Sequence, residues 1–234
     1  MSLILCIETA TAACSVSLLR NGKSFLTRRS DIKNAHSTVL NLFIEQLMTE
    51  GGFQYSDLDA VAVSKGPGSY TGLRIGVSTA KGLGYALDIP VMAPETLLCM
   101  ASGFVSSNHD LPDDALICPM IDARRMEVFT AVYDIHLNPL KPIAALIVDD
   151  AAFSDLPAGR PLYFFGDGAE KCAETLSRQE NRFFHPGFIN SANHMAGLVT
   201  AYYNESRFED LAYFEPFYLK DFIAGAPKVK GLRP

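Results

Sequence analysis

Short apolar runs separated by turn residues predict strands at the start of the chain. Residues 3–7 are continuously apolar, which is typical of a central strand buried on both faces. Residues 14–19 and 23–29 predict two further strands, and Asn21-Gly22 between them is a strong two-residue hairpin signal. The chain is therefore expected to open with a three-stranded antiparallel meander.

Helices and short strands are expected to alternate after this meander. Apolar residues cover more than one stripe of the first helix, so we expect its own sheet to bury one side and another helix to bury the other. This helix is expected to begin near His36, with Asn34 or Ser37 as N-cap, and to end at Gly51-Gly52. The later elements of this half are a strand at 60–64, a helix at 72–87, a short strand at 91–92 and a helix at 94–106.

A second domain is expected after a polar segment that contains Pro112. Its elements are strands at 116–121, 126–133, 143–148 and 161–165, and helices at 149–156, 169–177 and 191–203. The two halves are loosely alike, since each begins with a strand hairpin and continues with αβ units. We therefore expect an N-terminal subdomain at 1–108 and a C-terminal one at 109–224, with the segment 218–223 docking on the first subdomain, and a loose basic tail at 225–234.

The Gly-rich loop before the second helix resembles a phosphate-binding turn in composition but not in spacing. Five residues separate Gly66 from Gly72, and Leu73 stands where a Walker motif needs lysine. Thr71 replaces the third glycine of a dinucleotide fingerprint, and Ser69 lacks the flanking glycines of a nucleophile elbow. The loop could at most bind an anion weakly at the helix N-terminus.

Small residues recur at every fourth position of the second helix, at Gly72, Gly76, Ala80 and Gly84. A glycine costs a helix roughly 1 kcal/mol relative to alanine, so we expect another backbone to approach this ridge closely. Two interpretations remain open, packing within the chain and a helix–helix interface with another chain. Under the second, replacing Gly76 or Ala80 with Leu should block assembly and leave the fold intact.

Composition and charge exclude several functions. The chain has 234 residues and a net charge of -6, which argues against strong independent binding to nucleic acid. Its five cysteines are widely spread without a Cys-x-x-Cys motif, so they are expected to be reduced thiols in the cytoplasm. The five histidines are far apart, and we predict no metal site, no catalytic residue and no cofactor. Neither a signal peptide nor a membrane span is expected.

Several motifs occur together in one order along the chain. They are Ile-Leu-Cys-Ile-Glu-Thr-Ala-Thr at 4–11, Cys-Ser-Val-Ser-Leu at 14–18, Ala-His-Ser at 35–37, Lys-Gly-Pro-Gly-Ser-Tyr-Thr-Gly-Leu-Arg-Ile-Gly at 65–76, Ala-Lys-Gly-Leu at 80–83, Asp-Ala-Arg-Arg at 122–125 and Gly-Asp-Gly at 166–168. With them the chain resembles the bacterial TsaB (YeaZ) family over nearly its whole length. The run at 66–76 is the specific part, and the departures are Glu8 for the usual Asp and Lys220 for the usual Arg.

The resemblance implies an α/β fold of two ribonuclease-H-like (actin-like ATPase) subdomains, each a mixed sheet with an antiparallel hairpin or meander and flanking helices. It also implies a non-catalytic scaffold subunit for threonylcarbamoyl transfer to the adenosine beside the anticodon of tRNA. The partners would be TsaD in a heterodimer, the ATPase TsaE in a ternary complex, and tRNA through that complex, with a homodimer when the chain is alone. The related catalytic subunit holds its metal with two histidines four residues apart, and the corresponding segment 91–100 here has no histidine.

Two sets of site residues follow. The predicted partner interface lies on the first two helices and consists of His36, Val39, Leu40, Phe43, Leu47, Gly72, Leu73, Gly76, Ala80 and Gly84. The candidates for residual nucleotide or anion contacts are Glu8, Thr9, Gly66, Gly68, Ser69, Gly166, Asp167 and Gly168. The alternative function is a small enzyme of the same fold, either a nucleotide-dependent kinase or a metallohydrolase.

Overall fold

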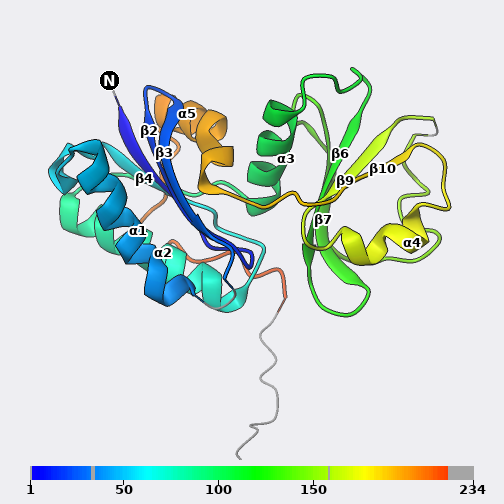
Figure 1. Ribbon diagram of the computed structural model, residues 1–234, viewed down its shortest axis with the longest axis horizontal. Coiled ribbons are helices and arrows are strands. Elements are labelled where there is room, and N and C mark those ends of the chain that lie inside the picture. The colour runs from blue at the N-terminus through cyan, green and yellow to red at the C-terminus, as the bar shows by residue number, and fades with distance from the viewer. Residues whose placement is uncertain (1, 33–34, 158, 221–234) are drawn as a thin grey trace, which may run out of the picture.

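Two five-stranded mixed sheets organise the computed structural model, which describes residues 2–32, 35–157 and 159–220 (Figure 1). The strand orders are β3-β2-β1-β4-β5 and β10-β9-β6-β7-β8. In each sheet an antiparallel meander of three strands is extended by two parallel strands. The two halves therefore repeat one topology, as the predicted fold class requires.

The first half follows the predicted pattern closely. Asn21 and Gly22 have φ values of 52° and 78°, as the tight turn between two strands of the meander requires. The elements are β1 (Leu3–Glu8), β2 (Cys14–Arg20), β3 (Lys23–Ser30), α1 (His36–Gly51), η1 (Tyr55–Asp57), β4 (Ala60–Val63), α2 (Tyr70–Leu87), β5 (Val91–Met92) and α3 (Thr96–Ser107).

The ends of the two long helices of this half need one correction. The N-cap of α1 is Ala35, without a side-chain hydrogen bond, so the prediction of Ser37 was wrong and Asn34 lies outside the described residues. Gly52 ends α1 in the left-handed conformation, with φ 71°. Ser69 caps α2, because its side chain accepts a hydrogen bond from the Gly72 N–H.

The second half departs from the prediction in its short elements. The elements are β6 (Leu116–Asp122), β7 (Glu127–Asp134), β8 (Pro139–Ile147), β9 (Leu162–Phe165), η2 (Glu170–Cys172), α4 (Ala173–Leu176), β10 (Arg182–His185), η3 (Ala192–Met195) and α5 (Ala196–Asn204). The segment 149–156 forms turns and not the predicted helix, since Phe153 has φ 65°, which a right-handed helix cannot contain. Strand β10 and the turn η1 had not been predicted.

Helices cover both faces of each sheet. On the first sheet, α1 and α2 bury one face with residues such as Leu40 and Val77, while η3 and α5 bury the other with Met195 and Val199. On the second sheet, α4 and the turns at 149–156 cover one face. The remaining face packs against α3, where Phe104 stacks on Phe165 with 4.1 Å between ring centroids.

The helices α3 and α5 cross between the two halves. Helix α3 follows β5 in the chain but lies against the second sheet, and α5 follows β10 but lies against the first (Figure 1). Cys99 of α3 also joins the core of the first sheet. The domain boundaries expected at 108 and 109 stay a prediction. No helix among the described residues is long and apolar enough to cross a membrane.

Candidate functional site

Glu8 ends β1, and its side chain is completely buried. Its Oε1 accepts hydrogen bonds from the Ala10 N–H at 2.7 Å and from the Ser64 hydroxyl at 2.8 Å. Burial raises the pKa of this carboxyl, and these hydrogen bonds and the nearby Asn190 amide partly oppose the effect. Asn190 is near enough to influence Glu8. Among the described residues, however, neither the Asn190 Nδ2 nor the Glu8 Oε2 has any hydrogen-bond partner. The carboxyl group is therefore enclosed by protein.

The glycines of the Gly-rich loop between β4 and α2 lie against the chain's own backbone. A Cβ atom added to Gly66 would lie 2.4 Å from the Phe217 carbonyl oxygen, and one added to Gly68 would lie 2.3 Å from the Ala10 carbonyl oxygen. The Ser69 N–H donates a hydrogen bond to that same Ala10 oxygen at 2.6 Å. Internal packing thus accounts for both glycines and for one N–H donor of the loop.

The small-residue ridge of α2 also faces the chain itself. A Cβ atom added to Gly72 would lie 2.0 Å from the Thr9 carbonyl oxygen, and one added to Gly76 would lie 2.2 Å from the Thr9 hydroxyl oxygen. At Gly84 the nearest atom would be Cγ2 of Val91, at 2.5 Å. The structure therefore supports packing within the chain. The expectation that Leu at Gly76 leaves the fold intact was wrong, because the space is already filled by the buried Thr9.

Most of the predicted interface residues point inward. Only Val39 and Phe43 are partly exposed. The other eight are buried, namely His36, Leu40, Leu47, Gly72, Leu73, Gly76, Ala80 and Gly84. These eight residues pack within the chain, because the apolar stripe of a helix marks the face that packs on its own sheet, and their role in partner contacts stays a prediction.

The outer face of α1 and α2 carries other apolar side chains. Leu42 on α1 is 48% exposed, and Tyr85 on α2 is 86% exposed. Phe43 and Ile75 are partly buried at the edge of the first core. The two helices cover the same face of the first sheet (Figure 1). An apolar surface for a partner is therefore available on the side opposite to the buried stripe.

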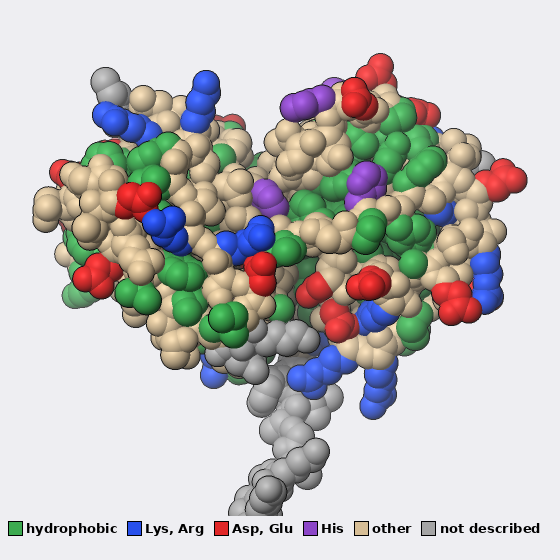
Figure 2. Space-filling view, viewed as in Figure 1, with side chains coloured by type: hydrophobic (Ala, Val, Ile, Leu, Met, Phe, Trp, Pro, Cys, Tyr) green, Lys and Arg blue, Asp and Glu red, His purple; other side chains and the backbone are tan. Residues whose placement is uncertain are grey.

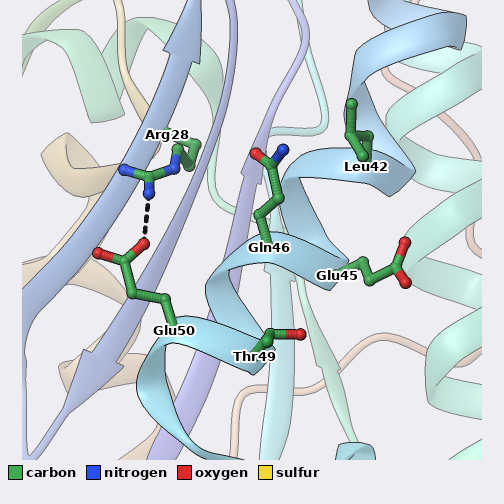
Figure 3. A pocket seen from close by; sticks show the side chains of 6 residues that line it. All are labelled: Arg28, Leu42, Glu45, Gln46, Thr49 and Glu50. Atoms are coloured by element: carbon green, nitrogen blue, oxygen red, sulfur yellow. Dashed lines mark hydrogen bonds and ion pairs between the residues drawn. The ribbon is translucent and has the colours of Figure 1, made fainter.

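An open groove runs along α1 beside β3 (Figure 3). Arg28 of β3 forms an ion pair with Glu50 of α1 at one side of this groove. Leu42, Glu45, Gln46 and Thr49 of α1 complete its lining. The groove thus places polar side chains beside the exposed apolar side chain of Leu42.

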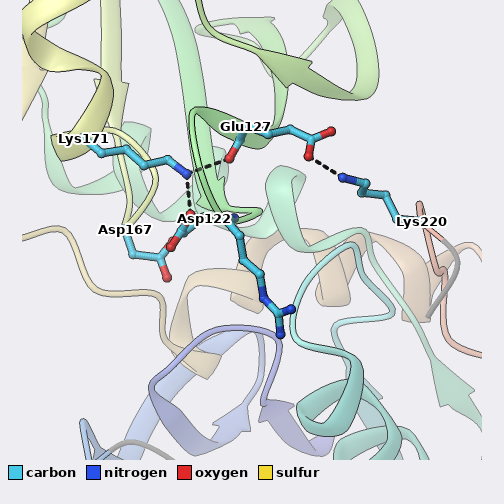
Figure 4. A network of polar contacts seen from close by, with 6 residues as sticks. Asp122, Glu127, Asp167, Lys171 and Lys220 are labelled. Atoms are coloured by element: carbon cyan, nitrogen blue, oxygen red, sulfur yellow. Dashed lines mark hydrogen bonds and ion pairs between the residues drawn. The ribbon is translucent and has the colours of Figure 1, made fainter. Parts of the chain in front are cut away.

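In the second half, a polar network joins the β6–β7 turn to the turn after β9 (Figure 4). Lys171 contacts the Asp122 carboxylate and donates a hydrogen bond to the Glu127 carbonyl oxygen at 2.7 Å. The Asp122 N–H donates to Oδ1 of Asp167 at 3.0 Å. Burial raises the pKa of Asp167, and the neighbouring charge of Asp122 adds to the increase. The Asp122 and Asp167 carboxylates of this network are therefore bound by other groups of the same chain.

The glycines beside Asp167 have structural reasons of their own. Gly166 has φ 96°, and a Cβ atom there would lie 2.3 Å from the Met120 carbonyl oxygen. A Cβ atom on Gly168 would lie 2.8 Å from the carbonyl carbon of Ile121. The turn therefore needs both glycines to lie against the end of β6.

The histidines do not gather into one site. His36 is buried at the start of α1, and its Nε2 lies 2.9 Å from the Thr11 carbonyl oxygen. His194 stacks on Phe188, and burial lowers its pKa to about 4. Within the described ranges, no three His, Cys, Asp or Glu side chains are placed to hold a metal ion.

The C-terminal strap, residues 208–220, follows α5 and packs back onto the first half. The Phe217 N–H donates to the Lys65 carbonyl oxygen at 2.7 Å, and Lys81 Nζ of α2 donates to the Phe214 carbonyl oxygen at 2.7 Å. Phe214 is buried in the core of the first sheet. In the sequence, the aromatic residues of this segment were the signal that could have predicted its packing on the first half. Of the segment 218–223, Tyr218 contacts α2, and 221–223 lies outside the described residues, as does the tail 225–234.

Comparisons with known proteins agree with this picture. A family model described as "TsaD: tRNA N6-adenosine threonylcarbamoyltransferase" matches residues 30–223. The TsaB protein of tRNA threonylcarbamoyladenosine biosynthesis from Bacillus subtilis is 33% identical over 192 residues, which are 81% of this chain and 80% of that protein. The corresponding protein of Escherichia coli is 35% identical over 130 residues, which are 56% of this chain and 54% of that protein.

Solved structures give the same result at the level of the fold. YeaZ from Pseudomonas aeruginosa has a TM-score of 0.79 and 25% identity, covering 94% of this chain and 100% of that one. An activator of 2-hydroxyisocaproyl-CoA dehydratase from Clostridium difficile, solved with bound ADPNP, has a TM-score of 0.51 at 12% identity, covering 88% of this chain and 96% of that one. This second likeness concerns the fold alone, and it confirms the predicted actin-like ATPase architecture. Because the family model spans residues 30–223 and a TsaB that is 33% identical aligns with 81% of this chain, the chain belongs to the TsaB (YeaZ) family.

Proposed function

We propose that this chain is a non-catalytic subunit of the cytoplasmic machinery that makes threonylcarbamoyladenosine in tRNA. It would bind TsaD as a heterodimer, recruit the ATPase TsaE, and meet tRNA within that complex. Membership of the TsaB family supports the pathway. The observation that supports the non-catalytic role is the internal packing of the Gly-rich loop, since the carbonyl oxygens of Phe217 and Ala10 occupy the space beside its glycines.

The outer face of α1 and α2 is the surface that we propose for TsaD. Leu42 and Tyr85 are exposed on neighbouring helices, and Phe43 and Ile75 connect them to the core. Aromatic and large aliphatic side chains of this kind are the usual anchors of protein–protein interfaces. The same face could pair with its copy around a two-fold axis, which accounts for a homodimer when TsaD is absent.

Charge supports a shared rather than an independent role in RNA binding. Basic and acidic side chains are interspersed on the face in Figure 2, and no large basic patch is visible there. Together with the net charge of -6, this favours a subunit that reaches RNA only in company.

Reconstitution tests the proposal directly. Threonylcarbamoyl transfer to unmodified tRNA would be measured with purified TsaD and TsaE, in the presence and absence of this chain. We expect transfer to depend on the chain. An equal rate without it would reject the assignment.

Calorimetry with ATP and magnesium on the isolated chain tests the competing function, a small enzyme of the same fold. The proposed role predicts no tight binding. Tight binding together with turnover that is lost in Glu8→Gln would favour the enzyme.

A further inference from the structure

An aromatic and cationic cluster lies where the strap crosses the start of α2. The rings of Tyr70 and Tyr218 are 4.7 Å apart between centroids, with 35° between their planes. The Arg74 guanidinium lies 4.3 Å from the Tyr70 ring centroid, and its Nε donates to the Tyr218 hydroxyl at 3.2 Å. Arg74 is exposed, so a flat cation that lies over the Tyr70 ring and donates to the Tyr218 hydroxyl is presented to solvent.

A second cationic feature is the β6–β7 turn. Arg124 and Arg125 are both exposed and both left-handed, with φ 72° and 51°, where Asn and Gly are the unstrained choices. The Asp122 carboxylate accepts a hydrogen bond from the Arg124 N–H at 2.9 Å and is itself held by Lys171. The turn therefore holds two adjacent arginines in a fixed backbone conformation.

Acidic partners of these three guanidinium groups are missing from residues 2–32, 35–157 and 159–220. Across the part of the chain that the structure describes, no carboxylate lies within 4.0 Å of the side-chain nitrogens of Arg74, Arg124 or Arg125. Other exposed arginines do have such partners, as in the Arg28–Glu50 and Arg178–Asp150 pairs. Within the described residues, Arg124 and Arg125 are thus free of carboxylates, and Arg74 has only the two tyrosines as neighbours of its charge.

The strap connects the two features. Tyr218 contacts Arg74 on the first half, and Lys220, two residues later, forms an ion pair with Glu127 on the second half. Glu127 follows the β6–β7 turn directly, and Figure 4 shows Lys220 reaching it from the strap. The stacked cluster and the arginine turn are therefore joined by a few residues of one segment.

We propose that these groups form a contact for a short single-stranded stretch of RNA, with a base stacked on the Arg74–Tyr70–Tyr218 cluster and phosphates held by Arg124 and Arg125. Aromatic rings and guanidinium planes are the surfaces on which unpaired RNA bases stack, and adjacent arginines suit phosphate oxygens. An acidic peptide would use the cations but not the rings. The inference rests on the proposed function, which brings tRNA to the complex, and adds the residues that this chain would contribute.

The experiment measures binding of an unmodified anticodon stem-loop RNA to the full complex with TsaD and TsaE by fluorescence anisotropy at several salt concentrations. We expect R124Q/R125Q to lower the slope of log affinity against log salt by about 1.4, since each lost single-strand phosphate contact removes about 0.7. The matched variant R178Q, which removes an arginine on the surface of the second half, should keep the wild-type slope.

The stacking contact is tested separately at Tyr218. We expect Tyr218→Ala to weaken binding about tenfold, and Tyr218→Phe to lose much less because it keeps the ring. Gel filtration and thermal unfolding of each variant complex check assembly and folding.

Unchanged affinity and slope in assembled R124Q/R125Q and Tyr218→Ala complexes would overturn the RNA contact. Loss of TsaD from either folded variant would also overturn it, because these residues would then serve a protein partner. Transfer to tRNA by the wild-type complex is measured alongside. If the wild-type complex transfers independently of this chain, the proposed function fails; if wild type transfers and the variants bind RNA normally, only this inference fails.

Discussion

Close contacts with Thr9 explain why α2 contains glycine at its buried positions. Gly72 faces the Thr9 carbonyl oxygen and Gly76 faces the Thr9 hydroxyl, so the end of β1 lies against the bare backbone of the helix. Gly82 is different, because it is exposed and no atom lies within 4 Å of a Cβ atom placed there. The same residue type therefore has opposite consequences at two positions of one helix.

Alanine at these two positions should separate the effects. Gly72→Ala places a Cβ atom 2.0 Å from a backbone oxygen, so we expect the free energy of unfolding to fall by about 1–3 kcal/mol. Gly82→Ala should raise it by about 0.5–1 kcal/mol, since only helix propensity changes. Urea denaturation of both variants and wild type is the measurement, and equal effects at the two sites would contradict the packing described for α2.

Glu8 should make stability depend on pH in a characteristic direction. Burial raises its pKa in the folded protein above the unfolded value of about 4.3, so the folded state holds the proton more tightly. Stability is then lost as pH rises from the unfolded pKa through the raised folded pKa. Glu8→Gln should remove this loss, so the variant gains stability relative to wild type as pH rises above the unfolded pKa of about 4.3. Unfolding curves at several pH values test this, and a difference that shrinks as pH rises would contradict it.

At the scale of the elements, the sequence predicts what a segment is better than what it touches. The meander was predictable because its apolar runs and the Asn21-Gly22 turn between two of them can be recognised from neighbouring residues alone. The turns at 149–156 were not, since the left-handed backbone of Phe153 leaves no mark in an apolar pattern. Strand β10 was missed because its four residues derive their conformation from parallel pairing with β9.

The predicted interface residues show a related limit of the sequence pattern. Apolar periodicity shows which side of a helix is buried but not what buries it, and Leu40 and Leu47 are buried by the chain's own sheet. Leu42 and Tyr85, which lie off that stripe, could have been found only as large side chains on the polar face. The spacing of the glycines correctly predicted that another part of a backbone approaches α2 closely. It could not show that this neighbour is Thr9 of the same chain.

At the scale of the whole molecule, crossing elements join the two halves. Helix α3 carries Phe104 into the core of the second sheet and Cys99 into that of the first. The strap returns from α5 to α2 and then reaches Glu127 through Lys220. Sequence order does not reveal these exchanges, because they depend on contacts between residues far apart in the chain.

The outer face of α1 and α2, where Leu42 and Tyr85 are exposed, is the surface that we propose for both self-association and TsaD. If a single surface serves both, the two complexes exclude each other, and TsaD should dissolve the homodimer. Leu42→Glu puts a charge at a side chain that is 48% exposed, so it should weaken both assemblies without lowering stability appreciably. The matched control Leu140→Glu changes a side chain that is 46% exposed on β8 of the second half.

Sedimentation velocity of the chain alone and with increasing TsaD measures both equilibria. We expect a homodimer that gives way to a heterodimer for wild type and Leu140→Glu, and a monomer with weakened TsaD binding for Leu42→Glu. A Leu42→Glu chain that loses only one of the two assemblies would show that they use different surfaces. A ternary species with TsaD bound to an intact homodimer would lead to the same conclusion, because one face cannot hold two partners at once.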